Sequence, residues 1–353
     1  MPVTAQQMLK VAGVGAGYFS RFHYDSWARM DRARCVAVCD TDLAKAQSVH
    51  ARAYDDLAIM LSEQQPDILD VILPPAGQTD VIRAALQKGT KWIICQKPFC
   101  MSLAQAHALT AEADAAGAKL IIHENFRFQP WYRVIATELQ NGALGQLHQA
   151  TFRLRPGDGQ GPDAYLARQP SFQQMPRFLV QETAVHWIDT FRFLLGNPTA
   201  VYADLRQINP AIAGEDAGHI LFDHPNGVRA LFDGNRHLDH AADNLRRTMG
   251  EALFEGTEGT LTLRGDGAVM FRNFGASAER EVLPPDPFDG FGGDCVHALQ
   301  SHVVHAILEG TEVENTARDY LDVRMIEDAI YTSAATGTKQ PLSYPLRPAL
   351  RAR

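Results

Sequence analysis

The chain has 353 residues, which is long enough for two domains at roughly 150 residues each. Its formal net charge of -8 is spread without a long run of like charges, which disfavours binding to nucleic acid or to anionic membranes. Residues 1–8 lack the basic start and apolar run of a signal peptide, and no apolar stretch reaches the roughly 18 residues that cross a membrane.

The first third of the chain alternates short apolar segments with helical ones. The expected strands are Leu9–Val14, Cys35–Cys39, Ile68–Leu73, Lys91–Cys95 and Lys119–His123. The clearest helix between them runs from Ala104 to Ala116, because Ser102 and Gln105 have the spacing of a capping box and Gly117 can end it. This alternation predicts an α/β fold, with a Rossmann domain built on a doubly wound parallel sheet over residues 1–125.

The first strand leads into a turn of small residues, Gly15-Ala-Gly-Tyr-Phe-Ser20, that opens a helix. Glycine at the first position permits a tight turn, and Gly17 lets backbone amides approach a pyrophosphate at the positive end of the helix. Asp40 ends the second strand, where its carboxylate would bond the ribose hydroxyls. An ordinary βα turn is the alternative for the glycines alone. Together with Asp40 they predict NAD as the cofactor, with Tyr18 and Phe19 among its contacts.

The strand that begins near Lys91 ends in Cys95-Gln-Lys-Pro98. It places the ammonium group of Lys97 at the carboxyl edge of the sheet, where open α/β folds bind their ligands. Taken alone, Lys97 is more typical of a solvated surface lysine, because a single Lys-Pro pair is not a motif, but the sequence context on both sides favours a role in catalysis. Pro74 follows the third strand and is predicted to border the cofactor, although a proline pair at a strand end is also a plain stop signal.

With these features in register, the chain resembles the Gfo/Idh/MocA family of NAD(P)-dependent sugar and polyol oxidoreductases. The family motif at residues 95–98 is usually Cys-Glu-Lys-Pro, and this chain has Gln96 in place of the glutamate. Gln78 stands where a histidine is common. The resemblance implies that both glutamines lie on the nicotinamide side of the cofactor site. It continues through His123–Phe128, which is similar to the strand and hinge that lead into the family's second domain.

After residue 125 the pattern changes to a helix, Trp131–Gln140, followed by alternating strands. These are Leu147–Arg155, Val201–Gln207, Gly218–Asp223, Val228–Asp233, Met249–Glu255, Gly259–Leu263 and Ala268–Arg272. Strands joined by short turns imply an α+β domain with a large, mainly antiparallel sheet over residues 126–353. The helices Asp294–Leu308 and Arg318–Thr336 can cover only part of a broad sheet face. A homodimer or homotetramer formed through the sheet is therefore expected, and the resemblance implies the same.

A helix is predicted from Glu182 to Leu195, and Glu182, His186 and Asp189 share one of its faces. The family segment here reads Asp-x-Gly-x-His-x-x-Asp, in which the first Asp and the His complete a catalytic set with the lysine. The resemblance places Glu182 at that Asp and His186 at the His, with Asp189 in a structural role. The alternative is that His186 is a core histidine held by Asp189 and that Glu182 is favoured by the helix dipole.

The segment Pro156–Met175 is long and irregular, as functional loops often are. Asn235–His240 ends a strand and either faces the pocket or forms a solvated turn. The residues expected to line the substrate pocket, besides the catalytic ones, are Asn125, Arg127, Tyr165, Arg168 and Arg177.

Removal of hydride from a carbon that bears a hydroxyl requires a base for the O–H proton and positive charge near the developing carbonyl oxygen. His186 is assigned as the base and Lys97 as the electrostatic group, with the reverse assignment kept open. Glu182 is expected to bind substrate hydroxyls. Because no cluster of arginines is apparent along the chain, the expected substrate is a neutral sugar or polyol.

The motifs around Lys97 and His123–Phe128 are most similar to a branch of the family that includes D-apiose dehydrogenases, which form a lactone. The alternatives are an NAD-dependent glycosidase with transient redox chemistry and a sugar-sensing regulatory protein without catalysis. The presence of Lys97 together with His186 argues against a pure sensor. Steady formation of NADH from free sugars, as opposed to release of an aglycone from a glycoside, would distinguish the dehydrogenase from the glycosidase. The five cysteines include no pair spaced for zinc or for redox chemistry, so we expect no metal and a cytoplasmic protein with reduced thiols.

Overall fold

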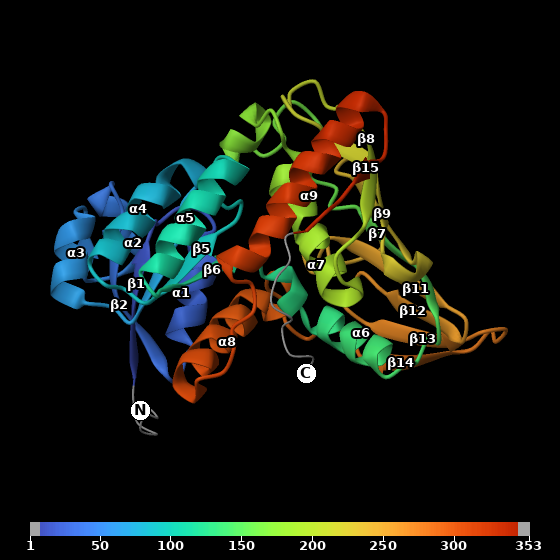
Figure 1. Ribbon diagram of the computed structural model, residues 1–353, viewed down its shortest axis with the longest axis horizontal. Helices are drawn as coiled ribbons and strands as arrows, with labels where there is room; N and C mark the ends of the chain where they lie inside the picture. Colours follow the sequence, from blue (N-terminus) through green and yellow to red (C-terminus); the bar gives the residue numbers. More distant parts are fainter. Residues whose placement is uncertain (1–7, 345–353) are drawn as a thin grey trace.

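The computed structural model describes residues 8–344, and helix α9 (Ala317–Thr336) runs between its two sheets (Figure 1). The first sheet has six strands in the order β3-β2-β1-β4-β5-β6, all parallel to their neighbours. Its strands are β1 (Leu9–Val14), β2 (Ala33–Cys39), β3 (Ala53–Tyr54), β4 (Ile68–Val71), β5 (Trp92–Gln96) and β6 (Lys119–His123). The predicted doubly wound parallel sheet is confirmed, and β3 is a short strand that the sequence pattern did not indicate.

The helices of this domain are α1 (Ser20–Ala28), α2 (Leu43–Val49), α3 (Leu57–Gln64), α4 (Pro75–Gln87) and α5 (Leu103–Ala115). The predicted cap of α5 is present, since the Ser102 hydroxyl accepts the Gln105 amide and Gly117 adopts a φ of 62°. Gln105, however, accepts from the amide of Met101. Helix α1 begins two residues later than Tyr18, so the glycine turn is longer than expected.

The two faces of the parallel sheet are covered from different parts of the chain. Met60, Ile82 and Leu109, on α3, α4 and α5, pack in the core that includes strand residues Leu69 and Ile93. The other face packs against Trp27 of α1 and against α8 (Cys295–Glu309), whose buried residues include Leu299 and Val303. The expectation that α8 covers the antiparallel sheet was therefore wrong. The chain returns from the second domain to complete the first one.

The second sheet has nine strands in the order β14-β13-β12-β11-β7-β10-β9-β8-β15, antiparallel except where β10 pairs with β7. The strands are β7 (Leu147–Leu154), β8 (Ala200–Arg206), β9 (Ala217–Asp223), β10 (Arg229–Asn235), β11 (Gly250–Gly256), β12 (Gly259–Leu263), β13 (Val269–Asn273), β14 (Glu279–Leu283) and β15 (Gln340–Pro341). The α+β prediction is confirmed, with edge strands β14 and β15 added to it.

One face of this sheet packs against α6 (Pro130–Gln140), α7 (Val185–Leu195) and α9. The Trp187 ring of α7 stacks on Phe152 of β7 at a centroid distance of 4.1 Å, and Phe232 of β10 lies 5.5 Å from the same indole. Buried aromatic pairs of this kind stabilise a fold by about 0.5–1.5 kcal/mol beyond their buried area. They hold α7, which carries His186, firmly against the sheet.

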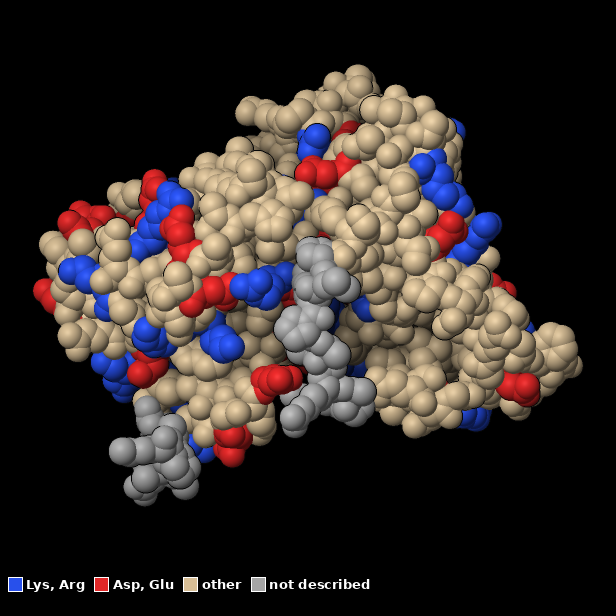
Figure 2. Space-filling view, in the orientation of Figure 1, with Lys and Arg blue, Asp and Glu red and all other residues tan. Residues whose placement is uncertain are grey.

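The face of the molecule in Figure 2 shows basic and acidic side chains interspersed, without a broad patch of one sign. This distribution agrees with the modest net charge of -8. Within residues 8–344, no helix is both long and apolar enough to cross a membrane.

Candidate active site

A cavity of about 890 Å³ lies where the carboxyl edge of the parallel sheet meets the second domain. Its wall on the Rossmann side includes Gly17, Tyr18, Phe19, Pro74, Gln96 and Lys97. The opposite wall includes Asp158, Arg168, Arg177, Glu182, His186 and Arg236. A volume of this size is in the usual range for a site that holds small ligands. The predicted glycine turn and Lys97 therefore lie on one wall of the cavity, and Glu182 and His186 lie on the opposite wall.

The glycine turn is shaped for a ligand rather than for side chains. Gly15 has a φ of 105°, and a Cβ there would lie 2.4 Å from the Ile72 carbonyl oxygen, so this position requires glycine. A Cβ at Gly17 would meet no atom within 4 Å, and Gly17 lines the cavity. The turn thus leaves open space at the start of α1, where backbone amides can bind a pyrophosphate. These residues fit a dinucleotide.

Asp40 supports the same turn from the end of β2. Its Oδ2 accepts the Ala16 amide at 2.7 Å, and its Oδ1 accepts the Asp42 amide at 2.9 Å. Each carboxylate oxygen retains a second lone pair with which it can accept a hydrogen bond. Asp40 thereby fixes the glycine turn in addition to the ribose contact predicted for it.

The two glutamines near Lys97 have different surroundings. Gln78 is fully buried, and its amide nitrogen donates to the carbonyls of Leu73, Gln96 and Pro98. It therefore braces the loop after β5 and does not lie on the cavity wall, which corrects its assignment as a cofactor contact. Gln96 does line the cavity, and its side-chain oxygen accepts the Lys97 amide at 2.8 Å.

Lys97 projects from the end of β5 to the segment that precedes α7. Its Nζ donates to the Glu182 carboxylate at 2.9 Å and to the Glu182 carbonyl at 2.5 Å. Glu182 lies in a widened π-helical turn, Leu179–Ala184, and α7 itself begins at Val185. The predicted helix is thus confirmed from Val185 to Leu195, but its first three residues lie in the π-helical turn. In this wider turn both the carbonyl and the carboxylate of Glu182 reach the same ammonium group.

Glu182 lies between two cations. Arg236, at the end of β10, approaches the second carboxylate oxygen at 3.5 Å, and Thr183 donates its hydroxyl to that oxygen. Burial alone would raise the pKa of the Glu182 carboxyl, but the charges of Lys97 and Arg236 outweigh it and hold that pKa well below its usual range. Glu182 is therefore a carboxylate at neutral pH and can accept hydrogen bonds from hydroxyl groups.

His186 lies on the first turn of α7, and its ring lines the cavity. Its Nδ1 bonds to the carboxylate of Glu124, which directly follows β6 and is fully buried. The Phe126 ring stacks on the imidazole at 3.8 Å with an interplanar angle of 5°. Burial lowers the pKa of His186, and the Glu124 carboxylate opposes this effect in part. Sequence reasoning gave Glu124 no role.

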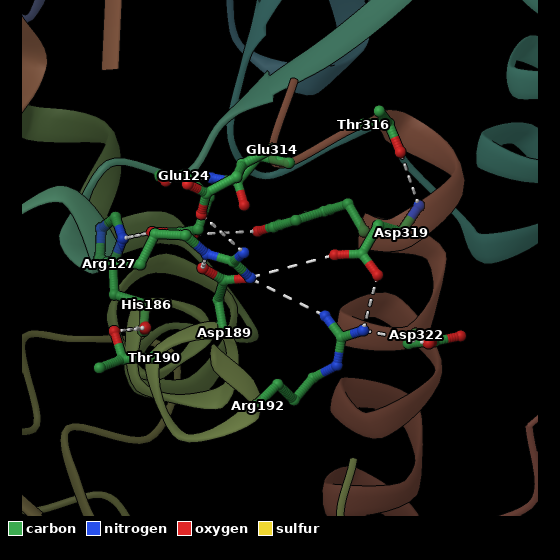
Figure 3. A network of polar contacts seen from close by, with 12 residues as sticks. Glu124, Arg127, His186, Asp189, Thr190, Arg192, Glu314, Thr316, Asp319 and Asp322 are labelled. Atoms are coloured by element: carbon green, nitrogen blue, oxygen red, sulfur yellow. Dashed lines mark hydrogen bonds and ion pairs between the residues drawn. The ribbon is translucent and has the colours of Figure 1, made fainter. Parts of the chain in front are cut away.

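Asp189 does not hold His186. It forms a two-pronged ion pair with Arg127, at 2.6 and 2.8 Å, and both residues are buried (Figure 3). Arg127 also approaches Glu314, and Arg192 of α7 pairs with Asp319 and Asp322 of α9. This network binds the hinge after β6 to α7 and α9. The substrate contact predicted for Arg127 is not found, because its guanidinium is used in this network.

Two other predicted pocket residues also lie off the cavity wall. Asn125 is buried and donates to the Cys295 thiol at 3.0 Å. Tyr165 is buried behind Arg236, which donates to its hydroxyl at 2.6 Å. Arg168 and Arg177 do line the cavity, as expected. The loop that carries Tyr165 is irregular, as predicted, apart from a short 3-10 helix at Pro170–Gln174. It packs around a buried cluster that includes Phe172, Phe178 and Ile212.

Arg236 and Arg246 also line the cavity. Arg236 belongs to the segment Asn235–His240, for which the pocket was one of two expected places, whereas Arg246 was not singled out in the sequence. Three of the four cavity arginines have carboxylate partners. Arg168 and Arg236 both pair with Asp158, and Arg177 pairs with Asp328. Arg246 donates to the Tyr18 hydroxyl at 3.1 Å, next to the glycine turn. Most of this positive charge is thus balanced within the chain, and Arg246 lies towards the nucleotide end.

Comparison with known proteins agrees with this geometry. Residues 9–124 match the model of the oxidoreductase family with an NAD-binding Rossmann fold, Gfo/Idh/MocA, and residues 132–262 match the family's C-terminal domain. D-apiose dehydrogenases from Paraburkholderia graminis and Rhizobium rhizogenes are 32% and 28% identical, cover 95% and 93% of this chain, and are themselves covered over 90% and 96% of their length.

A solved oxidoreductase from Agrobacterium radiobacter, in complex with NAD+, L-tartaric acid and magnesium, is also similar to this chain. It has a TM-score of 0.86 and 26% identity, and the match covers 95% of this chain and 98% of that one. The family model matches the glycine turn and Asp40, and the second model matches the segment that carries Glu182 and His186. The chain therefore belongs to the Gfo/Idh/MocA oxidoreductases and is an NAD-dependent enzyme of that family.

Proposed function

We propose that this enzyme is a dehydrogenase that oxidises a hydroxyl-bearing carbon of a neutral sugar or polyol. The observation that carries the proposal is the placement of Lys97, Glu182 and His186 around one cavity that also includes Gly17. A neutral imidazole and an ammonium group can supply the base and the positive charge that alcohol oxidation requires, and a carboxylate can bind the other hydroxyls of the substrate.

Each of these side chains has a separate part in the proposed reaction. His186 takes the hydroxyl proton on its free ring nitrogen, because burial keeps the imidazole neutral near pH 7. Lys97 donates a hydrogen bond to the oxygen that becomes a carbonyl, and its charge stabilises the developing negative charge. Glu182 orients the substrate by accepting hydrogen bonds from neighbouring hydroxyls. The bound NAD would supply the hydride acceptor for this oxidation.

The residues proposed to hold NAD are Gly15, Gly17, Tyr18, Phe19, Asp40, Pro74, Gln96 and Lys97. The glycine turn supplies backbone amides for the pyrophosphate, and Asp40 supplies a carboxylate at the ribose position. Phe19 presents an apolar ring to the cavity beside Gln96 and Lys97. With NAD held in this way, its reactive end would be expected near Lys97, in the cavity that His186 and Glu182 also line.

A neutral substrate is supported by the pairing of the cavity arginines. Arg168, Arg177 and Arg236 each have a carboxylate within 3.3 Å, so they do not require an anion from the substrate. The two relatives named as D-apiose dehydrogenases make that branched pentose the first substrate to test, with its lactone as the product.

The proposal is tested by screening D-apiose, other aldoses and polyols for NADH formation. A dehydrogenase produces NADH in proportion to the sugar consumed. Release of an aglycone from a glycoside without net NADH would favour the glycosidase instead. Binding of NAD and sugar with no turnover of either kind would favour the sensor.

We also propose that the enzyme is a dimer or tetramer assembled through the open face of the second sheet. The strand register aligns Leu221, Leu231, Thr151, Leu253 and Thr262 in one row across five strands on that face. Tyr202 and Met270 extend this row at its two ends. Apolar side chains in the middle of a sheet face, with charged rows beside them, are typical of a surface that a second copy covers.

A cytoplasmic location and a division into residues 1–125 and 126–353 stay proposals as well; the ends of these ranges lie outside the described residues. The location is supported by the five cysteines, all of which are free. The return of α8 to the first sheet suggests a refinement of the division, in which residues 295–309 count with the first domain.

A further inference from the structure

Two residues outside the proposed catalytic set, Glu124 and Phe126, fix the His186 ring. Glu124 binds Nδ1, and Phe126 covers one face of the ring at 3.8 Å. Both residues belong to the segment that leaves β6, at the carboxyl edge of the parallel sheet. The imidazole therefore cannot rotate without breaking its contact with a buried carboxylate. Nε2 is the ring nitrogen that remains for the cavity.

Glu124 is itself held in place by the C-terminal part of the chain. Its second carboxylate oxygen accepts the Tyr320 hydroxyl of α9 at 3.2 Å. Its backbone carbonyl accepts the side-chain amide of Asn315, which precedes the same helix. Glu124 and Tyr320 are 0% and 1% exposed, so neither contact competes with water. A buried chain of hydrogen bonds thus runs from α9 through Glu124 to His186.

These contacts determine which ring nitrogen carries the proton. A carboxylate only accepts hydrogen bonds, whereas a neutral imidazole has one donor nitrogen and one acceptor nitrogen. The proton must then be on Nδ1, and Nε2 must present its lone pair. We propose that Glu124, oriented by Tyr320, is a positioning residue that holds His186 in the Nδ1–H form and so makes Nε2 the proton acceptor. This inference rests on the proposed role of His186 as the base.

The charges around His186 favour the same role. His186 lines the same cavity as Lys97 and Glu182, which pair with each other at 2.9 Å. Burial lowers the pKa of His123, on β6, well below its usual value, so this residue stays neutral. Asp189 forms an ion pair with Arg127. Glu124 is the carboxylate that touches the ring. It stabilises the imidazolium that forms when Nε2 takes up a proton.

The test uses the full-length enzyme and the variants Glu124→Gln, Tyr320→Phe and their combination. In Glu124→Gln, the Tyr320 hydroxyl favours the amide orientation that turns the carbonyl towards Tyr320 and the NH₂ group towards His186. That NH₂ group donates to Nδ1, so the proton moves to Nε2 and the base is lost. We expect kcat/KM to fall by about 10²- to 10⁴-fold, the range for loss of a general base or of its correct tautomer.

The combined variant separates positioning from simple support of the fold. Without the Tyr320 hydroxyl, the glutamine can turn its carbonyl to Nδ1 and restore the Nδ1–H form. The combined variant is therefore expected to be about tenfold more active than Glu124→Gln, although it carries one more substitution. Tyr320→Phe alone keeps the carboxylate and is expected to lose less than tenfold. A merely structural role for Glu124 predicts instead that the second substitution adds to the damage.

The tautomer is read directly by ¹⁵N NMR of histidine-labelled protein, in which the His186 signals are identified by their loss in His186→Ala. The wild type should show a protonated Nδ1, and Glu124→Gln a protonated Nε2. This measurement needs no substrate, so it remains decisive even if none of the tested sugars is oxidised. If Glu124→Gln does not fold, Glu124→Asp should retain the wild-type tautomer with a reduced rate.

The same tautomer in the wild type and in Glu124→Gln would overturn the inference. So would a combined variant that is less active than Glu124→Gln. A change of tautomer without a change in kcat/KM would show that the base lies elsewhere, and would overturn both the inference and the role of His186. Failure of the sugar screen with the expected change of tautomer would overturn the proposed substrate class and leave the positioning role of Glu124 supported.

Discussion

Replacing Lys97 by methionine removes the ammonium group from the cavity while keeping most of the volume of the side chain. At 2.9 Å, and with an effective dielectric constant near 20, the attraction between Lys97 and Glu182 is about 6 kcal/mol before the cost of desolvation. The contact between Arg236 and Glu182 at 3.5 Å gives about 5 kcal/mol on the same scale. Lys97 thus supplies roughly half of the charge stabilisation at Glu182, and Arg236 can keep that carboxylate ionised in the variant.

The loss of stability should therefore stay below the roughly 3–5 kcal/mol that follows when a fully buried ion pair is broken. The main effect of the substitution should be on the turnover number, kcat. A positioned donor to the developing oxyanion contributes about 10²–10³ in rate, so kcat should fall at least about 10²-fold, or about 2.7 kcal/mol. Binding of NAD should change little, because the glycine turn and Asp40 are untouched.

The assay measures kcat and KM with the sugar substrate, the Kd for NAD and the midpoint of thermal unfolding. Lys97→Arg is the matched control, because it retains the positive charge and is expected to retain more activity than Lys97→Met. Near-normal turnover in Lys97→Met, with the fold intact, would refute the assignment of Lys97 to the reacting oxygen. Loss of NAD binding in parallel with loss of turnover would refute the separation of the two roles.

The remaining predictions concern pH, cofactor choice and assembly. Because burial lowers the pKa of His186 below 6.5, the acid limb of the kcat/KM profile should lie below that pH, and His186→Ala should remove it; an unchanged limb would point to Lys97 as the base. Asp40→Ser should weaken the preference for NAD over NADP, since a 2'-phosphate beside the Asp40 carboxylate is repelled by up to about 4 kcal/mol; a wild type that prefers NADP would contradict this. Leu253→Arg should dissociate the oligomer in light scattering, whereas Ile59→Arg, at a residue that is 50% exposed on α3, should leave it intact.

Short sequence motifs were sufficient to predict the parts of the site that neighbouring residues form by themselves. The glycine turn and the end of β5 follow from rules that hold within a few residues, and the strand order of a Rossmann sheet then places Gly17 and Lys97 at the same edge. Glu182 and His186 were found through family resemblance, and their helical spacing suggested one shared face. The structure shows that spacing alone misplaces Glu182, since the π-helical turn before Val185 alters its direction.

Long-range pairing could not be predicted from local signals. Glu124 lies 62 positions before His186, and Arg236 lies 54 positions after Glu182, so no periodicity links the partners. Arg127 illustrates the converse error. Its place beside the hinge motif suggested substrate binding, but a buried carboxylate on α7 occupies its guanidinium. A buried charged side chain needs an oppositely charged partner, and that partner can be identified only from the folded structure, in which distant parts of the chain are in contact.

Helix α8 has a consequence for synthesis of the protein and for its engineering. Trp27, Leu299 and Val303 lie in one apolar cluster, although about 270 residues separate the first from the others. When the first 125 residues have been synthesised, α1 is therefore present on one face of the parallel sheet but α8 is not, and the part of that face under α8 stays exposed until the second domain has been made. Fragments that end near residue 125 should aggregate, and a transplant of the nucleotide-binding half into another protein should succeed when residues 295–309 are included.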